Sequence, residues 1–163
     1  MQVEIYCDGS CNTQTNIGAW AALIYSSLNQ YEIGDLVKET TNQAMELQAV
    51  ISALTFIEKN RILPEMVSSS ILIYTDSQYV CNLPLRRTKL ERQRFLNKKN
   101  NELPNYKKVQ ILYNFLDKFR ISIIKIKAHQ KRGQSIVSDR LRQVDKKARS
   151  MVRTIIKQDS KEF

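Results

Sequence analysis

The spacing of the apolar residues changes near residue 40, and this change constrains the fold more than any other feature of the chain. Three short segments before it have the pattern of β-strands, at residues 3–8, 18–25 and 31–37. After it, apolar residues recur at helical spacing over 42–60. Thr40 to Gln43 has the form of a capping box, and Pro64 forbids continuation. The pattern therefore predicts an antiparallel meander of three strands followed by a helix.

The rest of the chain alternates between strand and helix. The run at 71–75 is short, apolar and β-branched, as in a strand buried on both faces, and a helix is expected directly after it. The later segments indicate a basic excursion over 84–105 between Pro84 and Pro104, a helix over 107–119, a strand over 121–127 and a helix over 139–157. The order β-β-β-α-β-α-α-β-α predicts an α/β fold. Its five-stranded mixed sheet would have three antiparallel strands, then two parallel ones, with helices on both faces.

The size and composition of the chain favour a single domain over residues 1–163, because 42% apolar residues suffice for one core. No stretch approaches the roughly 20 apolar residues of a membrane span, and the N-terminus lacks the layout of a secretory signal. We therefore expect a monomeric, cytoplasmic protein. Cys7, Cys11 and Cys81 lack metal-ligand spacing and are expected to be reduced thiols.

Charge is distributed unevenly along the chain, whose net charge is +10. Residues 1–85 hold three basic side chains against nine acidic ones, whereas residues 86–163 hold 23 against seven. A basic surface releases counterions from a phosphate backbone on binding, so the second half favours a nucleic acid over a merely solvated surface. The acidic first half favours cations.

Three acidic residues occupy positions at which they should meet. Asp8 and Asp76 end the first and fourth predicted strands, which are usually central neighbours in such a sheet. Their edge is the one at which open α/β sheets place ligand sites. Glu46 lies in the first turn of the first predicted helix, between the apolar Met45 and Leu47. A carboxylate among apolar neighbours is costly without a partner, and a cation is the natural partner.

The last predicted helix holds two candidates for a fourth acid, Asp139 and Asp145. At 100° per residue, Asp145 lies within roughly 60° of the centre of the apolar face, whereas Asp139 lies on the opposite side. The position of Asp139 is typical of an acid at a helix N-terminus, where it interacts favourably with the macrodipole. Helix phase therefore favours Asp145.

Each acid taken singly has a plain structural explanation as a cap or an ion-pair partner. Four carboxylates converging on one spot, however, would repel one another unless divalent cations screened them. Two hard, oxygen-bound metal ions are what phosphodiester hydrolysis requires, one to activate the water and one to stabilise the leaving oxygen. The set of acids therefore predicts a two-metal nuclease more strongly than any one acid does.

Four blocks of sequence resemble the type 1 ribonuclease H family, which includes the ribonuclease H domains of reverse transcriptases. In chain order they are Tyr6-Cys7-Asp8-Gly9-Ser10-Cys11, Thr40-Thr41-Asn42-Gln43-Ala44-Met45-Glu46-Leu47, Tyr74-Thr75-Asp76-Ser77-Gln78-Tyr79-Val80 and Val144-Asp145-Lys146-Lys147-Ala148. The first block is weak by itself, whereas the ordered set, which spans nearly the whole chain, is specific. The resemblance implies a ribonuclease H-like fold and an endonuclease that hydrolyses the RNA strand of RNA–DNA hybrids, leaving 3′-hydroxyl and 5′-phosphate ends.

The resemblance also implies roles for single residues. It assigns four metal ligands, Asp8, Glu46, Asp76 and Asp145, to two Mg²⁺ ions that Mn²⁺ can replace. His129 resembles the family's loop histidine, which assists water attack or product release. Substrate contacts are implied for polar and basic residues, namely Cys11, Gln14, Thr41, Asn42, Gln43, Gln78, Arg86, Arg87 and Lys89. Asn42, Gln43 and Gln78 match positions that read the minor groove of the hybrid, partly through 2′-hydroxyls. Thr41 and Asn42 also qualify as helix caps.

Three features depart from the family pattern. His129 and Asp145 are 16 residues apart, longer than the family's usual interval, which Asp139 satisfies; we attribute the extra residues to a longer loop over Lys131–Val137. The glycine-rich segment that follows the first block in the family is replaced by residues 12–16. The basic excursion lacks the family's tryptophans, for which Phe95 and Tyr106 are candidate substitutes.

Two other classes of function share these features. A non-catalytic ribonuclease H-like module that only binds nucleic acid would have no reason to retain clustered like charges. A nuclease of the same fold that acts on DNA would share the acids. The blocks that contain Asn42 and Gln78 favour hybrid recognition over it.

Overall fold

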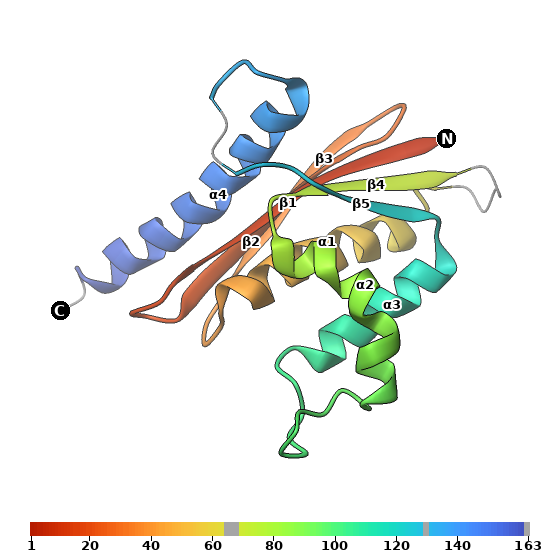
Figure 1. Ribbon diagram of the computed structural model, residues 1–163. Helices are drawn as coiled ribbons and strands as arrows, with labels where there is room; N and C mark the ends of the chain where they lie inside the picture. Colours follow the sequence, from red (N-terminus) through yellow and green to blue (C-terminus); the bar gives the residue numbers. More distant parts are fainter. Residues whose placement is uncertain (64–68, 129–130, 162–163) are drawn as a thin grey trace.

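The computed structural model describes residues 1–63, 69–128 and 131–161. Its elements follow the predicted order: β1 (Gln2–Asn12), β2 (Ile17–Tyr25), β3 (Gln30–Val37), α1 (Asn42–Lys59), β4 (Ser70–Thr75), α2 (Gln78–Arg92), α3 (Tyr106–Lys118), β5 (Ile121–Lys125) and α4 (Ile136–Asp159). The strands form one sheet in the order β3-β2-β1-β4-β5 (Figure 1). β1 and β2, and β2 and β3, pair antiparallel, whereas β4 pairs parallel with both β1 and β5. The predicted mixed sheet is confirmed.

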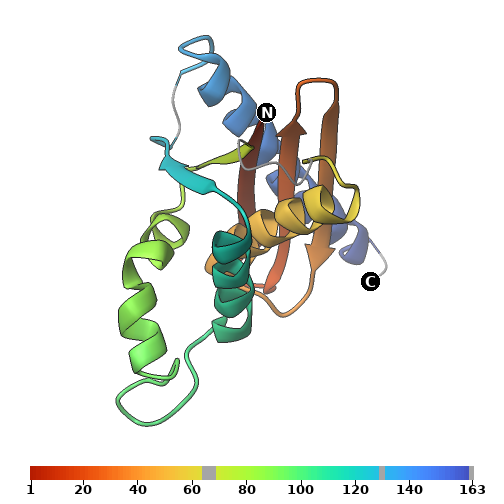
Figure 2. The ribbon, with the colours of Figure 1, turned by 90° about the vertical axis from the view of Figure 1, so that its right-hand side faces the viewer.

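Helices cover both faces of the sheet (Figures 1 and 2). Side chains alternate along β1, so Ile5 and Cys7 enter the core on one face and Tyr6 enters the core on the other. The larger core lies between the sheet and α1, α2 and α3. The smaller core lies beneath α4, to which Val144 and Ala148 contribute buried side chains. None of the helices in the described residues has the length and apolar character needed to span a bilayer.

The central pairing of β1 with β4 determines where the acids lie. This parallel ladder ends at the pair Tyr6 and Tyr74, so Asp8 and Asp76 each lie two residues beyond it at the same edge. We expected β1 to end at Asp8, but it continues to Asn12. The reason is that its last residues pair with β2 alone, beyond the end of β4.

α1 begins at Asn42, as predicted. Its cap is Thr41, whose hydroxyl accepts a hydrogen bond from the Ala44 N–H at 3.2 Å, rather than Thr40, the first residue of the capping-box pattern. The α2 boundary differs from the sequence prediction. α2 continues through Pro84 to Arg92, so the irregular part of the basic excursion starts after Arg92. Proline within a helix costs about 3 kcal/mol. Burial of three α2 side chains on one side of the helix offsets this cost, namely Val80, Leu83 and Leu90.

Candidate active site

Four carboxylates from four different elements line one edge of the sheet. Asp8 of β1, Asp76 after β4 and Asp145 of α4 line a cavity of about 260 Å³. The same three, together with Glu46 of α1, line an adjoining hollow. Residues far apart in the sequence therefore meet at one place because β1 and β4 are neighbours and α1 and α4 flank β1 on opposite faces.

Asp8 is the most deeply buried of these acids. Its exposure is only 7%. Burial, followed by the charges of Asp76 and Asp145, raises the pKa of Asp8 well above its ordinary value. The Gly9 N–H opposes this shift by donating a hydrogen bond to Asp8 Oδ1 at 2.8 Å. The cluster is therefore electrostatically unfavourable without a cation.

Glu46 is placed by the start of α1, between two completely buried neighbours, Met45 and Leu47. Its Oε2 accepts a hydrogen bond of 2.5 Å from the hydroxyl of Ser77. Burial raises the pKa of Glu46, and the Ser77 bond acts in the opposite direction. Ser77 also caps α2 by accepting from the Val80 N–H at 3.1 Å. Sequence reasoning gave Ser77 no role, although its position between a strand and a helix is a recognisable cap signal.

Asp145 lies in the third turn of α4 and is held by an arginine one turn further on. The Nε of Arg149 donates a hydrogen bond of 2.6 Å to Asp145 Oδ1. Arg149 and Arg153 line the same hollow as the acids. Sequence reasoning missed both arginines. The sequence pattern that could have identified them is their spacing of four and eight residues from Asp145, which places all three side chains on one side of a helix.

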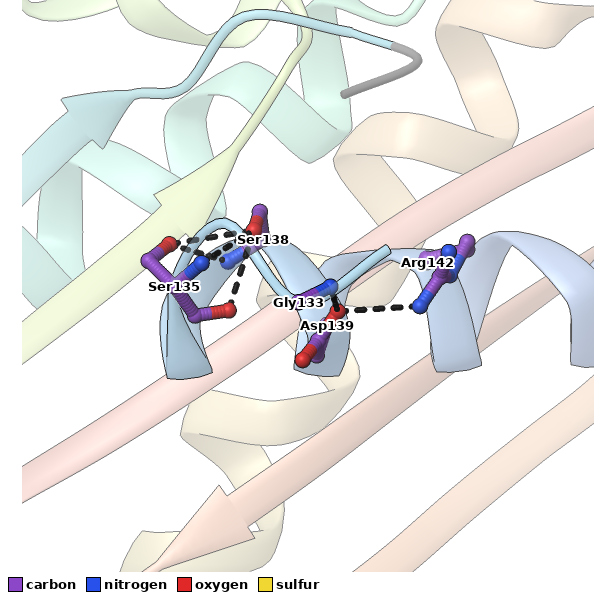
Figure 3. Close-up of polar contacts among 5 residues, drawn as sticks. All are labelled: Gly133, Ser135, Ser138, Asp139 and Arg142. Carbon is purple, nitrogen blue, oxygen red and sulfur yellow. Dashed lines mark hydrogen bonds and ion pairs between the residues drawn. The ribbon is translucent and has the colours of Figure 1, made fainter. Parts of the chain in front are cut away.

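Asp139 lies in the first turn of α4, where it makes hydrogen bonds to residues other than the four acids (Figure 3). Its Oδ1 accepts hydrogen bonds from the Gly133 N–H at 3.0 Å and from Arg142 at 2.9 Å. It is absent from the lining of the cavity and of the hollow. The structure thus brings Asp145, and not Asp139, to Asp8 and Asp76, in agreement with helix phase. The role of Asp145 as a metal ligand stays a prediction.

The start of α4 explains the long interval between His129 and Asp145. Ser135 and Ser138 form a capping box in which each side chain bonds the backbone of the other, so α4 begins at Ile136 (Figure 3). Ile136 and Val137, the last two residues of the predicted Lys131–Val137 loop, therefore belong to α4. His129 lies outside the described residues.

The donor set fits divalent metal ions in its chemistry. All four acids offer carboxylate oxygens, which Mg²⁺ and Mn²⁺ prefer. The raised pKa of Asp8 reflects its burial first and then the like charges of Asp76 and Asp145, which a cation would neutralise. As they stand, no three His, Cys, Asp or Glu side chains of the described residues are arranged to hold a metal ion. Glu46 is turned to Ser77 and Asp145 to Arg149. Metal loading would therefore have to exchange these two contacts for metal bonds.

Some of the predicted substrate residues lie beside the acids. The Cys11 N–H donates to Asn42 Oδ1 at 2.7 Å, and both residues line the hollow. Gln43 and Arg86 instead line a separate pocket between α2 and α3, together with the proposed aromatic substitutes, Phe95 and Tyr106.

Other predicted substrate residues are engaged within the protein or lie at a distance. Arg87 pairs with Asp117 at 2.6 Å and with Glu91 at 2.8 Å, so its guanidinium ties α2 to α3. Gln78 donates to Asn82 and accepts from Lys125. The remaining three are Thr41 at the α1 cap, Gln14 in the exposed turn after β1 and the exposed Lys89 on α2.

Gly9 allows β1 to approach α1 closely at the site. A Cβ built on Gly9 would lie 2.3 Å from the backbone nitrogen of Glu46 and from the backbone carbon of Met45. We expect Gly9→Ala to lower stability by about 1–3 kcal/mol, because either the strand or the helix has to move. Hybrid cleavage should fall as well, since the movement displaces Glu46 relative to Asp8.

The matched control for this variant is Gly133→Ala. The Cβ there would meet open space, and only the positive φ of +79° is unfavourable. Urea denaturation of both variants, with cleavage measured below the unfolding transition, separates the two effects. Equal cleavage by Gly9→Ala and Gly133→Ala would contradict a role for the close approach at the site.

Known proteins resemble the chain in both sequence and structure. The RNase H family model matches residues 1–152. A ribonuclease H of Syntrophomonas wolfei is 33% identical over 131 residues, which cover 78% of this chain and 84% of that protein. A ribonuclease H of Acetivibrio thermocellus is 27% identical over 90% of this chain and 99% of its own length. The solution structure of the PFV RNase H domain superposes on this chain with a TM-score of 0.69 and covers 93% of this chain and 94% of that domain. At 24% sequence identity this likeness supports the fold.

Proposed function

The chain belongs to the RNase H family, and on this premise we propose that it is a metal-dependent endonuclease that hydrolyses the RNA strand of RNA–DNA hybrids. One observation carries the proposal beyond the family. Asp8, Asp76 and Asp145 converge on one cavity, with Glu46 beside them, at the sheet edge. A structural explanation for each acid alone does not account for the convergence, because like charges brought together lower stability.

We propose that the four acids hold two Mg²⁺ ions, for which Mn²⁺ can substitute. Bound there, the metals would supply an activated water and charge stabilisation of the leaving 3′ oxygen, which leaves 3′-hydroxyl and 5′-phosphate ends. The protein's own groups prepare the site. The Gly9 N–H donates to Asp8 Oδ1 and fixes this carboxylate, whereas Ser77 holds Glu46 in the orientation that it leaves when metal binds.

The groups around the acids favour a hybrid over duplex DNA. The hollow next to the carboxylates is lined by polar residues, among them Ser10, Cys11, Asn12 and Asn42. Such groups can exchange hydrogen bonds with ribose 2′-hydroxyls in the wide minor groove of an A-like duplex. Arg149 and Arg153 of α4, which line the same hollow, supply positive charge for a phosphate backbone.

The test is a cleavage assay on three labelled duplexes: an RNA–DNA hybrid, double-stranded DNA and double-stranded RNA. We expect cleavage of the RNA strand of the hybrid alone, in Mg²⁺ or Mn²⁺, and none in EDTA. Absence of metal-dependent hybrid cleavage would refute the proposal and leave a module that only binds nucleic acid. Equal cleavage of duplex DNA would instead indicate a DNA nuclease of the same fold.

A further inference from the structure

A group of aromatic and charged side chains lies on the α4 face of the sheet, next to the acids. It consists of Glu4, Tyr6, Tyr25, Tyr74 and Arg140, which we name the Arg140 cluster. The rings of Tyr6 and Tyr74 stack with centroids 4.9 Å apart, and Tyr25 meets Tyr6 edge to face at 5.7 Å. The three rings come from three neighbouring strands and form a platform beneath the start of α4.

Arg140 of α4 is inserted into this platform. Its guanidinium carbon lies 3.6 Å from the ring centroid of Tyr25 and 5.1 Å from that of Tyr6. Its Nη1 donates to Tyr6 Oη at 3.0 Å and to Glu4 Oε2 at 3.1 Å, and Tyr6 Oη donates to the same Glu4 oxygen at 2.6 Å. Both hydrogen bonds leave one nitrogen, but stacking on the tyrosine rings requires a planar guanidinium, which lysine lacks.

The cluster is connected to each of the three elements that carry the aspartates. Tyr6 is two residues before Asp8 and lies on the same face of β1. Tyr74 is likewise two residues before Asp76. On α4, Arg140 is one helical turn before the buried Val144, the direct neighbour of Asp145. A shift of Arg140 relative to the tyrosines would therefore shift Asp145 relative to the other two aspartates.

We propose that Arg140 is a positioning residue for Asp145. It holds α4 at the position along the sheet, and at the rotation about the helix axis, at which the Asp145 carboxylate faces Asp8 and Asp76. The buried α4 side chains in this core are aliphatic, namely Val144, Ala148 and Val152. Their contacts are non-directional and tolerate small rotations and translations of the helix. The Arg140 contacts have defined directions and therefore do not tolerate such movements of the helix. This inference rests on the proposed metal-dependent function.

The test compares Arg140→Met with Lys147→Met. Lys147 forms another ion pair between α4 and the sheet, with Glu32 of β3, at similar exposure and two residues past Asp145. Mn²⁺ affinity is titrated without substrate by electron paramagnetic resonance. We expect it to fall about tenfold or more for Arg140→Met, as it does when a group that orients a metal ligand is removed. For Lys147→Met we expect it to stay within about twofold of the wild type. kcat should fall for Arg140→Met while the KM for the hybrid stays unchanged. Arg140→Lys should recover only part of the Mn²⁺ affinity.

Equal Mn²⁺ affinity of Arg140→Met and Lys147→Met would overturn the inference, as would full recovery by Arg140→Lys. If Arg140→Met does not fold, Tyr6→Phe serves in its place, because it removes only the hydroxyl that Arg140 contacts. Unchanged Mn²⁺ affinity of Tyr6→Phe would then count against the inference. A wild-type protein that neither binds Mn²⁺ nor cleaves the hybrid would instead refute the proposed function itself.

Discussion

Replacing Asp8 with asparagine should abolish hybrid cleavage and at the same time stabilise the metal-free protein. Loss of one of the four proposed metal ligands should lower kcat by about a thousandfold or more, corresponding to about 4 kcal/mol of transition-state stabilisation. The gain in stability has a separate cause. Asp8 is buried beside Asp76 and Asp145, and an uncharged amide of the same shape removes the repulsion among the three.

The stabilisation should depend on pH in a defined direction. Because the pKa of Asp8 is raised in the folded state, the folded protein retains a proton that the unfolded chain releases above its ordinary pKa near 4. This carboxyl therefore lowers stability as pH rises from about 4 toward the folded pKa, and the loss is complete above that value. The benefit of Asp8→Asn should be small at pH 4 and largest at neutral to alkaline pH.

Thermal unfolding in EDTA at pH 4 and pH 8 measures this effect. We expect the Tm of Asp8→Asn to exceed that of the wild type by a few degrees at pH 8, since 1 kcal/mol corresponds to about 2–4 °C in a domain of this size. Asp35→Asn is the control, because Asp35 is an exposed aspartate on β3, two strands across the sheet from β1. A lower Tm for Asp8→Asn at pH 8, or a gain of the same size for Asp35→Asn, would contradict the electrostatic explanation.

Replacing Asp145 with asparagine should also cause a severe loss of cleavage, whereas Asp139→Asn should remain within about twofold of the wild type. Asp145 lines the cavity with Asp8 and Asp76, and Asp139 bonds Gly133 and Arg142 at the start of α4. We expect a loss of about a hundredfold or more for Asp145→Asn, the smaller effect reflecting its greater exposure. Asp139→Asn should cost at most about 1 kcal/mol of stability through the helix N-terminus.

Kinetics of the two variants at saturating Mg²⁺, with Tm measured alongside, provide the comparison. The two substitutions are chemically identical and lie on the same helix, so each serves as the control for the other. A severe loss for Asp139→Asn with Asp145→Asn near wild type would show that the spacing from His129, and not helix phase, identifies the fourth ligand.

Local pattern was sufficient for most of the fold. The order of nine elements and the pairing of β1 with β4 were predicted, because the period of apolar residues changes between strand and helix and because each element is bounded by its own signals. Pro84 was misjudged because intrinsic propensity was weighed without the buried α2 side chains that outweigh it. The sequence left both Thr40 and Thr41 as candidate caps of α1, because backbone conformation, and not residue type, selects between adjacent threonines.

The sequence by itself determined which elements form and that Asp8, Glu46 and Asp76 end up at one edge, since these follow from local periodicity and from strand order. It left two arguments about the fourth acid in conflict. Only the tertiary structure decided that Asp145 lies at that edge, that Arg87 is tied to Asp117 and that Arg140 enters a platform of tyrosines. The physical reason for the two arginine contacts is that they join residues 30 or more positions apart in the chain. The position of Asp145 depends on where α4 begins and on which side of it packs on the sheet.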